Sequence, residues 1–264
     1  MKQMTIEDMK RIELEVMDEI HRICRDHGLR YYLFYGSLLG AVRHGGFIPW
    51  DDDIDIVMMR EDYEVLIGHF DEWRSSDRFS LALYKDGKNP CQYAKVVDST
   101  TRVREAFARR DYGTGIWVDV FPLDFYDSAN TACRKKIDRA GFMRSLILTN
   151  PDRGTTEAIR LAKKLACPLV ANKDPMKYCK RMDECCKKLC PQGSDLLVCA
   201  ITCDWGVLFP VELFTPDPVP IAFEDREYLT VAEKERALEI MYGDWQTPPP
   251  PGNREMHTMG AYYL

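Results

Sequence analysis

The sequence lacks any run of about 18 apolar residues, which is the length that a membrane-spanning helix needs. Its first ten residues, MKQMTIEDMK, also lack the apolar core of a signal peptide. These two absences lead us to expect a cytoplasmic chain. In that compartment its ten cysteines would be free thiols or metal ligands, because disulfides rarely persist there.

Basic residues are fewer than acidic ones, and the formal net charge is -6 at pH 7. Nucleic-acid-binding chains are more often basic, so we do not expect a nucleic-acid partner. The charge is nevertheless uneven, because residues 134–188 hold fifteen Lys or Arg and only six Asp or Glu. This basic segment is either a set of solvated helix faces or a surface for an anionic partner. An acidic lipid surface would be such a partner, and would place the chain peripherally at the inner membrane face.

The usual zinc signature is missing as well. Six cysteines fall within residues 179–203, yet no Cys-x-x-Cys pair occurs and no histidine lies nearby. Buried free thiols therefore account for this cluster better than a zinc ion, which stays open as the alternative.

Helical and strand-like patterns alternate along the first half of the chain. Thr5 and Asp8 form a capping-box pattern before an amphipathic stretch that ends near Gly28. REDYEVLIGHFDEW predicts a second helix, while YYLFY, DIDIVM, QYAKVV and GIWVDVFPLDFY predict strands, the last broken at Pro122. We expect a mixed α/β fold, with a core sheet and flanking helices over 1–133. A mostly helical basic insertion follows over 134–205, and a closing hairpin and proline-rich tail over 206–264.

Four aspartates fall within five positions of the stretch GSLLGAVRHGGFIPWDDDIDIVMM, residues 36–59. Residues i and i+2 of a strand point to the same face, which groups Asp53 with Asp55 and turns Ile54 and Ile56 toward the core. Two carboxylates on one face repel each other unless a cation lies between them. Mg²⁺, or Mn²⁺ in its place, prefers such oxygen ligands. The alternative is a solvated turn whose acids cap the neighbouring elements.

A third aspartate and a Gly-Ser turn favour the metal site over that alternative. Asp119 lies in an otherwise apolar strand, where an acid is costly unless it is paired or ligated. Gly36 permits close approach of the backbone, and Ser37 is placed to cap a short helix and offer its amide and hydroxyl to phosphate. This order of elements indicates a nucleotidyltransferase-type arrangement. In such a site the third acid completes the metal site and orients or deprotonates the attacking hydroxyl.

Several long motifs carry a resemblance to a known family. The sequence closely resembles the LicD family, whose relatives include fukutin and the fukutin-related protein. The matching motifs, weakest across the basic middle, are FYGSLLGAVRHGGFIPWDDDIDI, DYEVL, YAKVVDSTT, GIWVDVFPLD and MYGDWQTPPP. The resemblance implies a nucleotidyltransferase-like fold and a Mg²⁺-dependent phosphotransferase. Such an enzyme moves a phospho-alcohol from a CDP-linked donor to a hydroxyl of a cell-surface glycan, such as teichoic acid or lipopolysaccharide, and releases CMP.

The resemblance also implies donors and site residues. CDP-choline is the bacterial donor, CDP-ribitol is the donor in the fukutin branch, and CDP-glycerol is a third of the same kind. Asp53 and Asp55 match the metal-binding pair, and Asp119 matches the third acidic position. Gly36 and Ser37 match the turn that approaches phosphate. The acceptor would be a glycan or a lipid-linked glycan, which the basic segment would present.

Nearby cations have two possible roles each. Arg43 and His44 either reach the donor diphosphate or end a helix, and Lys95 either contacts phosphate or forms a structural salt bridge. In the tail, Arg254 and His257 are candidates to close over the donor. Two rival functions stay open. One is a nucleotidyltransferase that attacks the α-phosphorus of a nucleoside triphosphate, and the other is a non-catalytic glycan- or lipid-binding protein.

Overall fold

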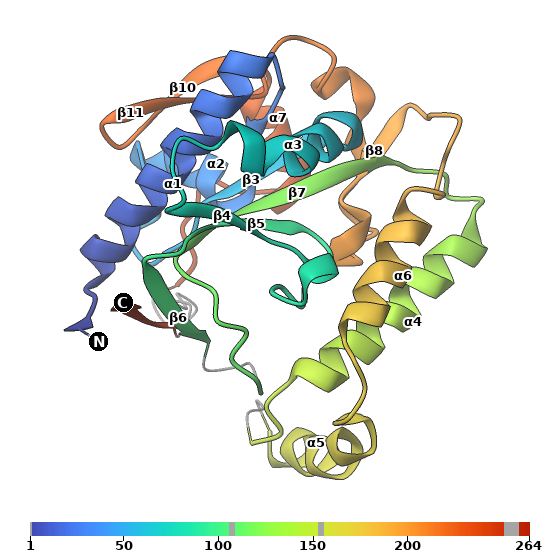
Figure 1. Cartoon of the computed structure of the whole chain (residues 1–264). Helices are drawn as coiled ribbons and strands as arrows, with labels where there is room; N and C mark the ends of the chain where they lie inside the picture. Colours follow the sequence, from blue (N-terminus) through green and yellow to red (C-terminus); the bar gives the residue numbers. More distant parts are fainter. Residues whose placement is uncertain (1, 106–108, 153–155, 251–258) are drawn as a thin grey trace.

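A mixed β-sheet forms the centre of the computed structural model (Figure 1), which describes residues 2–105, 109–152, 156–250 and 259–264. Its main strands run in the order β2-β3-β7-β5-β4, and β3 and β7 are parallel while the other neighbours are antiparallel. Their bounds are β2 Tyr32–Leu33, β3 Asp55–Met59, β4 Phe79–Ala82, β5 Ala94–Asp98 and β7 Trp117–Phe125. Two short strands, β8 (Leu196–Val198) and β9 (Phe209–Pro210), extend the sheet at the C-terminal end of β7, where β8 pairs with Asp124 and Phe125. The predicted mixed α/β fold is confirmed.

Two amphipathic helices pack against this sheet. Helix α1 (Ile6–His27) contacts β5 and β7, and α3 (Arg60–Trp73) contacts β3, β4 and β7. The predicted capping box is present, because the Asp8 N–H donates to Thr5 Oγ1 and the Thr5 N–H donates to Asp8 Oδ2, both at 3.1 Å. Helix α1 ends at Gly28, whose φ of 67° is the left-handed conformation that glycine adopts without strain.

Strand β7 is continuous through Pro122, so the predicted break there is wrong. Pro122 pairs with Met58 of β3 in the parallel register. On the other edge of β7, the described pairing with β5 reaches Val120, and the pairing with β8 begins at Asp124. Pro122 therefore lies where that edge has no described partner strand, and its missing N–H costs the sheet no hydrogen bond there.

The basic segment contains three helices, α4 (Thr131–Leu148), α5 (Glu157–Val170) and α6 (Met176–Cys186). Helices α4 and α6 lie side by side, and α5 lies across the end of this pair that is farthest from the sheet (Figure 1). The helical character of the segment matches the expectation. Whether 134–205 forms a separate domain stays a prediction.

The remaining elements close the fold around the sheet. Helix α2 (Tyr35–His44) contacts β3 and also α7 (Lys234–Tyr242) and β10 (Val219–Phe223), which brings the C-terminal part of the chain to the first motif. The expected late hairpin is formed by β10 (Val219–Phe223) and β11 (Arg226–Thr230). A separate three-stranded sheet joins β1 (Lys2–Gln3), β12 (Met259–Tyr263) and β6 (Thr101–Glu105). Three short 3₁₀ turns lie at Tyr84–Asp86, Ala200–Thr202 and Val211–Leu213.

Two further expectations concern the state of the cysteines and the presence of a membrane-spanning helix. All ten cysteines are free, and the side chains of Cys24, Cys167, Cys179, Cys186 and Cys199 are buried. Among the described helices, none combines the length and the apolarity that crossing a membrane requires.

Candidate active site

Asp55 and Asp119 face each other across the parallel pair β3–β7, where they are direct register partners. The alternation of β3 turns their neighbours Ile56 and Val120 to the other face, and both of these side chains are fully buried. Two aspartates that lie 64 positions apart in the sequence thus meet on one face of the sheet. This is the geometry that a two-carboxylate site requires.

The charge around Asp55 is strongly negative. Burial raises the pKa of the Asp55 carboxyl well above its usual range, and the nearby acids Asp53, Asp119 and Asp51 raise it further, while Lys95 lowers it. Strand β3 begins at Asp55, so Asp53 lies in the preceding loop rather than on the strand with Asp55. Asp53 is nevertheless close enough to act on the charge of Asp55.

Lys95 extends this row of charges onto the next strand. It is the register partner of Asp119 on β5, and its Nζ lies 3.0 Å from Asp119 Oδ1. Only 6% of Lys95 is exposed, and its Nζ also lies 3.6 Å from the centre of the Trp117 ring. The charge partner of this buried lysine is therefore Asp119, one of the candidate catalytic acids. Of its two open roles the salt bridge is present, and contact with phosphate stays a prediction.

Ser37 holds the start of β3 in place. The Asp55 N–H donates to Ser37 Oγ at 2.8 Å, and the Ser37 side chain is buried. The residue that caps α2 is Phe34, so the prediction that Ser37 caps this helix is wrong. The hydroxyl of Ser37 instead accepts from the backbone of the acid that it positions.

The Gly-Ser turn is tightly packed against the acidic loop. A Cβ at position 36 would lie 2.7 Å from Asp51 Oδ2, so only glycine fits there without a shift of that side chain. The residue before it, Tyr35, has φ of 45°, which is unusual for a residue with a side chain. Such strain at the start of α2 is typical of functional turns.

Arg43 and His44 lie in the last turn of α2, and both interact within the described structure. Arg43 Nη1 donates to the carbonyl oxygen of Trp245 at 2.8 Å, and Arg43 Nε donates to His44 Nε2 at 3.0 Å. Burial, and then the charge of Arg43, lower the pKa of His44. Arg43 thus ties the first motif to the C-terminal motif MYGDWQTPPP.

Aromatic residues that were not predicted as site residues lie around the two acids. The Phe121 ring packs against Tyr35 and Tyr93, with ring centres 5.5 and 4.3 Å apart. Burial and then Asp119 raise the pKa of Tyr93, whereas burial and then Asp55 raise the pKa of Tyr242. Tyr242 belongs to the motif MYGDWQTPPP, and membership of that motif is the feature of the sequence from which its place near the acids could have been predicted.

Arg254 and His257 lie outside the described residues.

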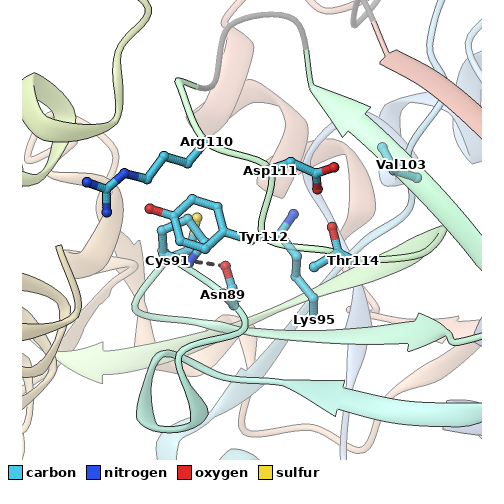
Figure 2. Close-up of a pocket in the computed structure, with 9 residues that line it drawn as sticks. Asn89, Cys91, Lys95, Val103, Arg110, Asp111, Tyr112 and Thr114 are labelled. Carbon is cyan, nitrogen blue, oxygen red and sulfur yellow. Dashed lines mark hydrogen bonds between the residues drawn. The ribbon is translucent and has the colours of Figure 1, made fainter. Parts of the chain in front are cut away.

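A small hollow opens beside Lys95 (Figure 2). It is lined by Asn89, Pro90, Cys91, Lys95, Val103, Arg110, Asp111, Tyr112 and Thr114, and its volume of about 30 Å³ has room for a water molecule. Figure 2 shows the Lys95 side chain reaching from β5 toward Tyr112 and Thr114. The buried Tyr112 hydroxyl has no hydrogen-bond partner in the part of the chain that the structure describes. The hollow can therefore hold a small polar group next to the charged row.

The pair Asp55 and Asp119 fits the ligand set of a magnesium ion. Mg²⁺ in proteins typically takes one or two carboxylates together with substrate phosphates. Within the described ranges, no three His, Cys, Asp or Glu side chains form a group that would hold a metal without such a substrate. Besides burial, the neighbouring carboxylates raise the pKa of Asp55. A divalent cation bound among these carboxylates would offset their mutual repulsion.

The comparison with known proteins places this geometry in a family. The family described as LicD/FKTN/FKRP, nucleotidyltransferase domain, matches residues 28–143. Residues 28–143 are a LicD-family domain. This LicD domain includes α2, β3, β5 and β7, and the predicted site residues from Gly36 to Asp119, whereas Arg254 and His257 lie outside it. The resemblance that the motifs carried is confirmed over these residues.

Individual relatives match this chain over different lengths. Lipopolysaccharide cholinephosphotransferase LicD of Haemophilus influenzae is 31% identical over 128 residues, which cover 47% of this chain and 46% of that protein. Ribitol 5-phosphate transferase FKRP of Homo sapiens is 44% identical over 54 residues, 20% of this chain and 10% of that protein. An uncharacterized protein of Rickettsia typhi, RT0683, is 42% identical over 62 residues, 23% of this chain and 20% of that protein. The chain thus spans less than half the length of the relatives that it matches.

Proposed function

We propose that the protein transfers a phospho-alcohol, with phosphocholine as the first choice, from a CDP-linked donor to a hydroxyl of a cell-surface glycan. The observation that carries the proposal is the opposed pair of Asp55 and Asp119 within a LicD-family domain. The names of two relatives, a cholinephosphotransferase and a ribitol 5-phosphate transferase, support a phosphotransferase that acts on glycans.

In the proposed reaction, the glycan hydroxyl attacks the β-phosphorus of the donor. The new bond forms between the glycan oxygen and that phosphorus, and the bond to the bridging oxygen breaks, so that CMP leaves. Bound Mg²⁺, held by Asp55 and Asp119 with Asp53 near by, would supply neutralisation of the diphosphate charge. Phosphoryl transfers depend mainly on such positioning and charge neutralisation.

The protein's own side chains would position the reactants. Lys95 fixes the carboxylate of Asp119, which would orient the attacking hydroxyl and accept its proton. Ser37 fixes the backbone of Asp55, and Gly36 leaves room for the acidic loop beside the turn. The aromatic rings of Tyr35, Tyr93 and Phe121 pack against one another beside the acids and would exclude water from that side of the site.

The proposal is tested first by donor binding. Thermal unfolding would be followed with CDP-choline, CDP-ribitol, CDP-glycerol, CTP and CMP, each with Mg²⁺ and with EDTA. A ligand at a hundred times its dissociation constant stabilises a protein by about 2.7 kcal/mol, which is readily measured. We expect Mg²⁺-dependent stabilisation by one CDP-alcohol, lost in Asp55→Asn and in Asp119→Asn. Asp71→Asn, on an exposed side chain of α3, is the matched control that keeps it.

Product analysis then separates the proposal from its rivals. Release of CMP together with a phosphorylated glycan would support the transfer. Release of pyrophosphate from CTP would instead support a nucleotidyltransferase. Glycan binding without metal dependence and without turnover would support a non-catalytic relative.

A further inference from the structure

The outward face of α5 is apolar, which is the reverse of an ordinary surface helix. Leu161, Leu165 and Leu169 are 62, 70 and 81% exposed, and they lie at i, i+4 and i+8 on one side of the helix. Of the nine large hydrophobic side chains that are exposed in the described residues, four belong to this single helix. An exposed apolar stripe of this kind marks an interaction surface.

The opposite face of α5 already has its partners. Cys167 and Val170 are buried, and α5 contacts α4 on the inner side. The packing of the protein's own core therefore accounts for one face of the helix and leaves the leucine stripe outside it. Helix α5 lies at the end of the helical segment that is farthest from the sheet (Figure 1), and the three stripe leucines on it are exposed.

A basic hollow follows directly after the helix. It has a volume of about 430 Å³ and is lined by Asn172, Lys173, Asp174, Lys177, Tyr178 and Arg181. The exposed side chains of Lys173, Lys177 and Arg181 form no ion pair within the described part of the chain. Residues 156–181 as a whole contain seven Lys or Arg and two acidic residues. The hollow is thus suited to a phosphate-bearing group.

We propose that α5 and this basic hollow dock the protein onto an anionic lipid bilayer. Two complementary features of this surface fit a bilayer. An apolar helical stripe enters the acyl boundary of a membrane, while the neighbouring lysines and arginine meet anionic headgroups. A partner protein would account for the leucines, but the excess of positive charge beside them matches a negatively charged surface.

The docking surface is connected to the candidate active site. Arg110 Nη2 donates to the carbonyl oxygen of Ala171, directly after α5, at 2.9 Å. Arg110 also lines the hollow beside Lys95 (Figure 2). If the proposed function holds, Arg110 links the docked helix to the wall of the hollow beside Lys95. The docking itself does not depend on the reaction.

Vesicle flotation tests the docking surface without any substrate. The full chain would be mixed with vesicles of phosphatidylcholine alone and with vesicles that also contain phosphatidylglycerol. We expect binding to the anionic vesicles that weakens as salt is added. Replacing all three stripe leucines by serine should lower the bound fraction by about tenfold or more. Lys173→Glu with Lys177→Glu should lower it by a similar factor, again about tenfold.

Matched variants separate docking from unspecific effects. Lys135→Glu with Lys136→Glu changes the charge by the same amount at the other end of α4, about 20 Å along that helix, and should leave binding within twofold. Val65→Ser removes an exposed apolar side chain from α3 and should also leave binding unchanged. Circular dichroism would check that every variant is folded.

Three outcomes would overturn the proposal. The first is no binding of the parent protein to anionic vesicles. The second is an equal loss of binding in the control pair at Lys135 and Lys136, which would reduce the effect to net charge. The third is a parent dimer that the leucine variant converts to a monomer in light scattering, which would make the stripe an interface between two copies of this chain.

Discussion

Lys95 Nζ lies 3.0 Å from Asp119 Oδ1, and Asp119 in turn faces Asp55 across the next strand pair. One cation and two carboxylates thus form a row across three neighbouring strands, β5, β7 and β3. The lysine forms its ion pair with Asp119, whereas burial and the acids Asp53, Asp119 and Asp51 raise the pKa of Asp55, so a divalent cation is stabilising at that end of the row. That end is where the loop with Asp51 and Asp53 approaches, and where we propose that Mg²⁺ binds.

Removing the cation of this row should destabilise the protein strongly. Lys95→Met leaves the carboxylate of Asp119 buried without its lysine, and breaking such a pair costs about 3–5 kcal/mol. Asp119→Asn in the same background removes the stranded charge and should recover part of that loss. Urea unfolding of the parent, both single variants and the double variant measures the coupling. Strictly additive losses would show that the pair contributes no net coupling.

Replacing Gly36 by alanine should impair the site, whereas replacing Gly68 by alanine should stabilise the protein. A Cβ at position 36 would meet Asp51 Oδ2 at 2.7 Å, whereas the exposed helical position 68 has no heavy atom within 4 Å. We expect Gly36→Ala to displace the acidic loop and to weaken Mg²⁺-dependent nucleotide binding. Gly68→Ala should instead stabilise the protein by about 0.5–1 kcal/mol, because alanine favours the helix. Calorimetry with and without ligand checks both, and unchanged binding in Gly36→Ala would contradict the assigned role.

An arginine on α3 fastens the basic helices to the sheet. Arg60 Nη2 lies 2.6 Å from Asp124 Oδ2 at the end of β7, and Arg60 Nη1 lies 2.9 Å from Asp183 Oδ1 on α6. Tyr84 also donates to Asp183, at 3.0 Å. Arg60→Met would leave two buried carboxylates without this guanidinium, which we expect to cost about 3–5 kcal/mol.

The effect of Arg60→Met should be local as well as global. Hydrogen exchange should show earlier opening of α6 than of β3, since the lost contacts join α6 to the sheet. Arg236→Met is the matched control, because that arginine pairs with Glu212 and Glu233 at an exposed position. Exposed pairs contribute about 0–1 kcal/mol. An equal loss of stability in the two variants would rule out the fastening role.

Local patterns in the sequence predicted the elements that carry the site. The run REDYEVLIGHFDEW matches α3 residue for residue, and the alternation in DIDIVM predicted β3 to within two residues. The formation of these helices and strands depends on residues that are close together in the sequence, so it can be predicted from local patterns. The family motifs then indicated which acids belong together.

The relationships across the site could not be predicted in the same way. The register that opposes Asp55 to Asp119, and Asp119 to Lys95, depends on how distant strands pair. Ser37 looks like a helix cap from its neighbours alone, yet the strand that packs against it supplies an N–H to its hydroxyl. Tyr242 reaches the acids only because α7 packs on α2. Each of these contacts is made by tertiary packing.

A buried acid on α1 should make stability depend on pH. Only 2% of Glu13 is exposed, and its Oε2 has no hydrogen-bond partner among the described residues. Burial raises the pKa of the Glu13 carboxyl well above its usual value of 4.5, and Asp53 and Asp52 raise it further, while Lys10 opposes them. The folded protein therefore favours the protonated form of this group.

The direction of the pH effect follows from that preference. The stabilising contribution of protonated Glu13 is fully present below pH 4.5 and is lost as the pH rises through the raised pKa. Glu13→Gln keeps a neutral side chain at every pH. The free energy of unfolding of Glu13→Gln should therefore rise relative to that of the parent above pH 4.5. We expect the difference to reach about 1–3 kcal/mol, which is the cost of leaving a buried polar group unsatisfied. Glu239→Gln, at an exposed position of α7, should show a constant difference. Urea unfolding from pH 4 to pH 8 measures the stability of the parent and of both variants. If Glu13→Gln loses stability relative to the parent as the pH rises, the fold stabilises the ionised carboxylate and the prediction is wrong.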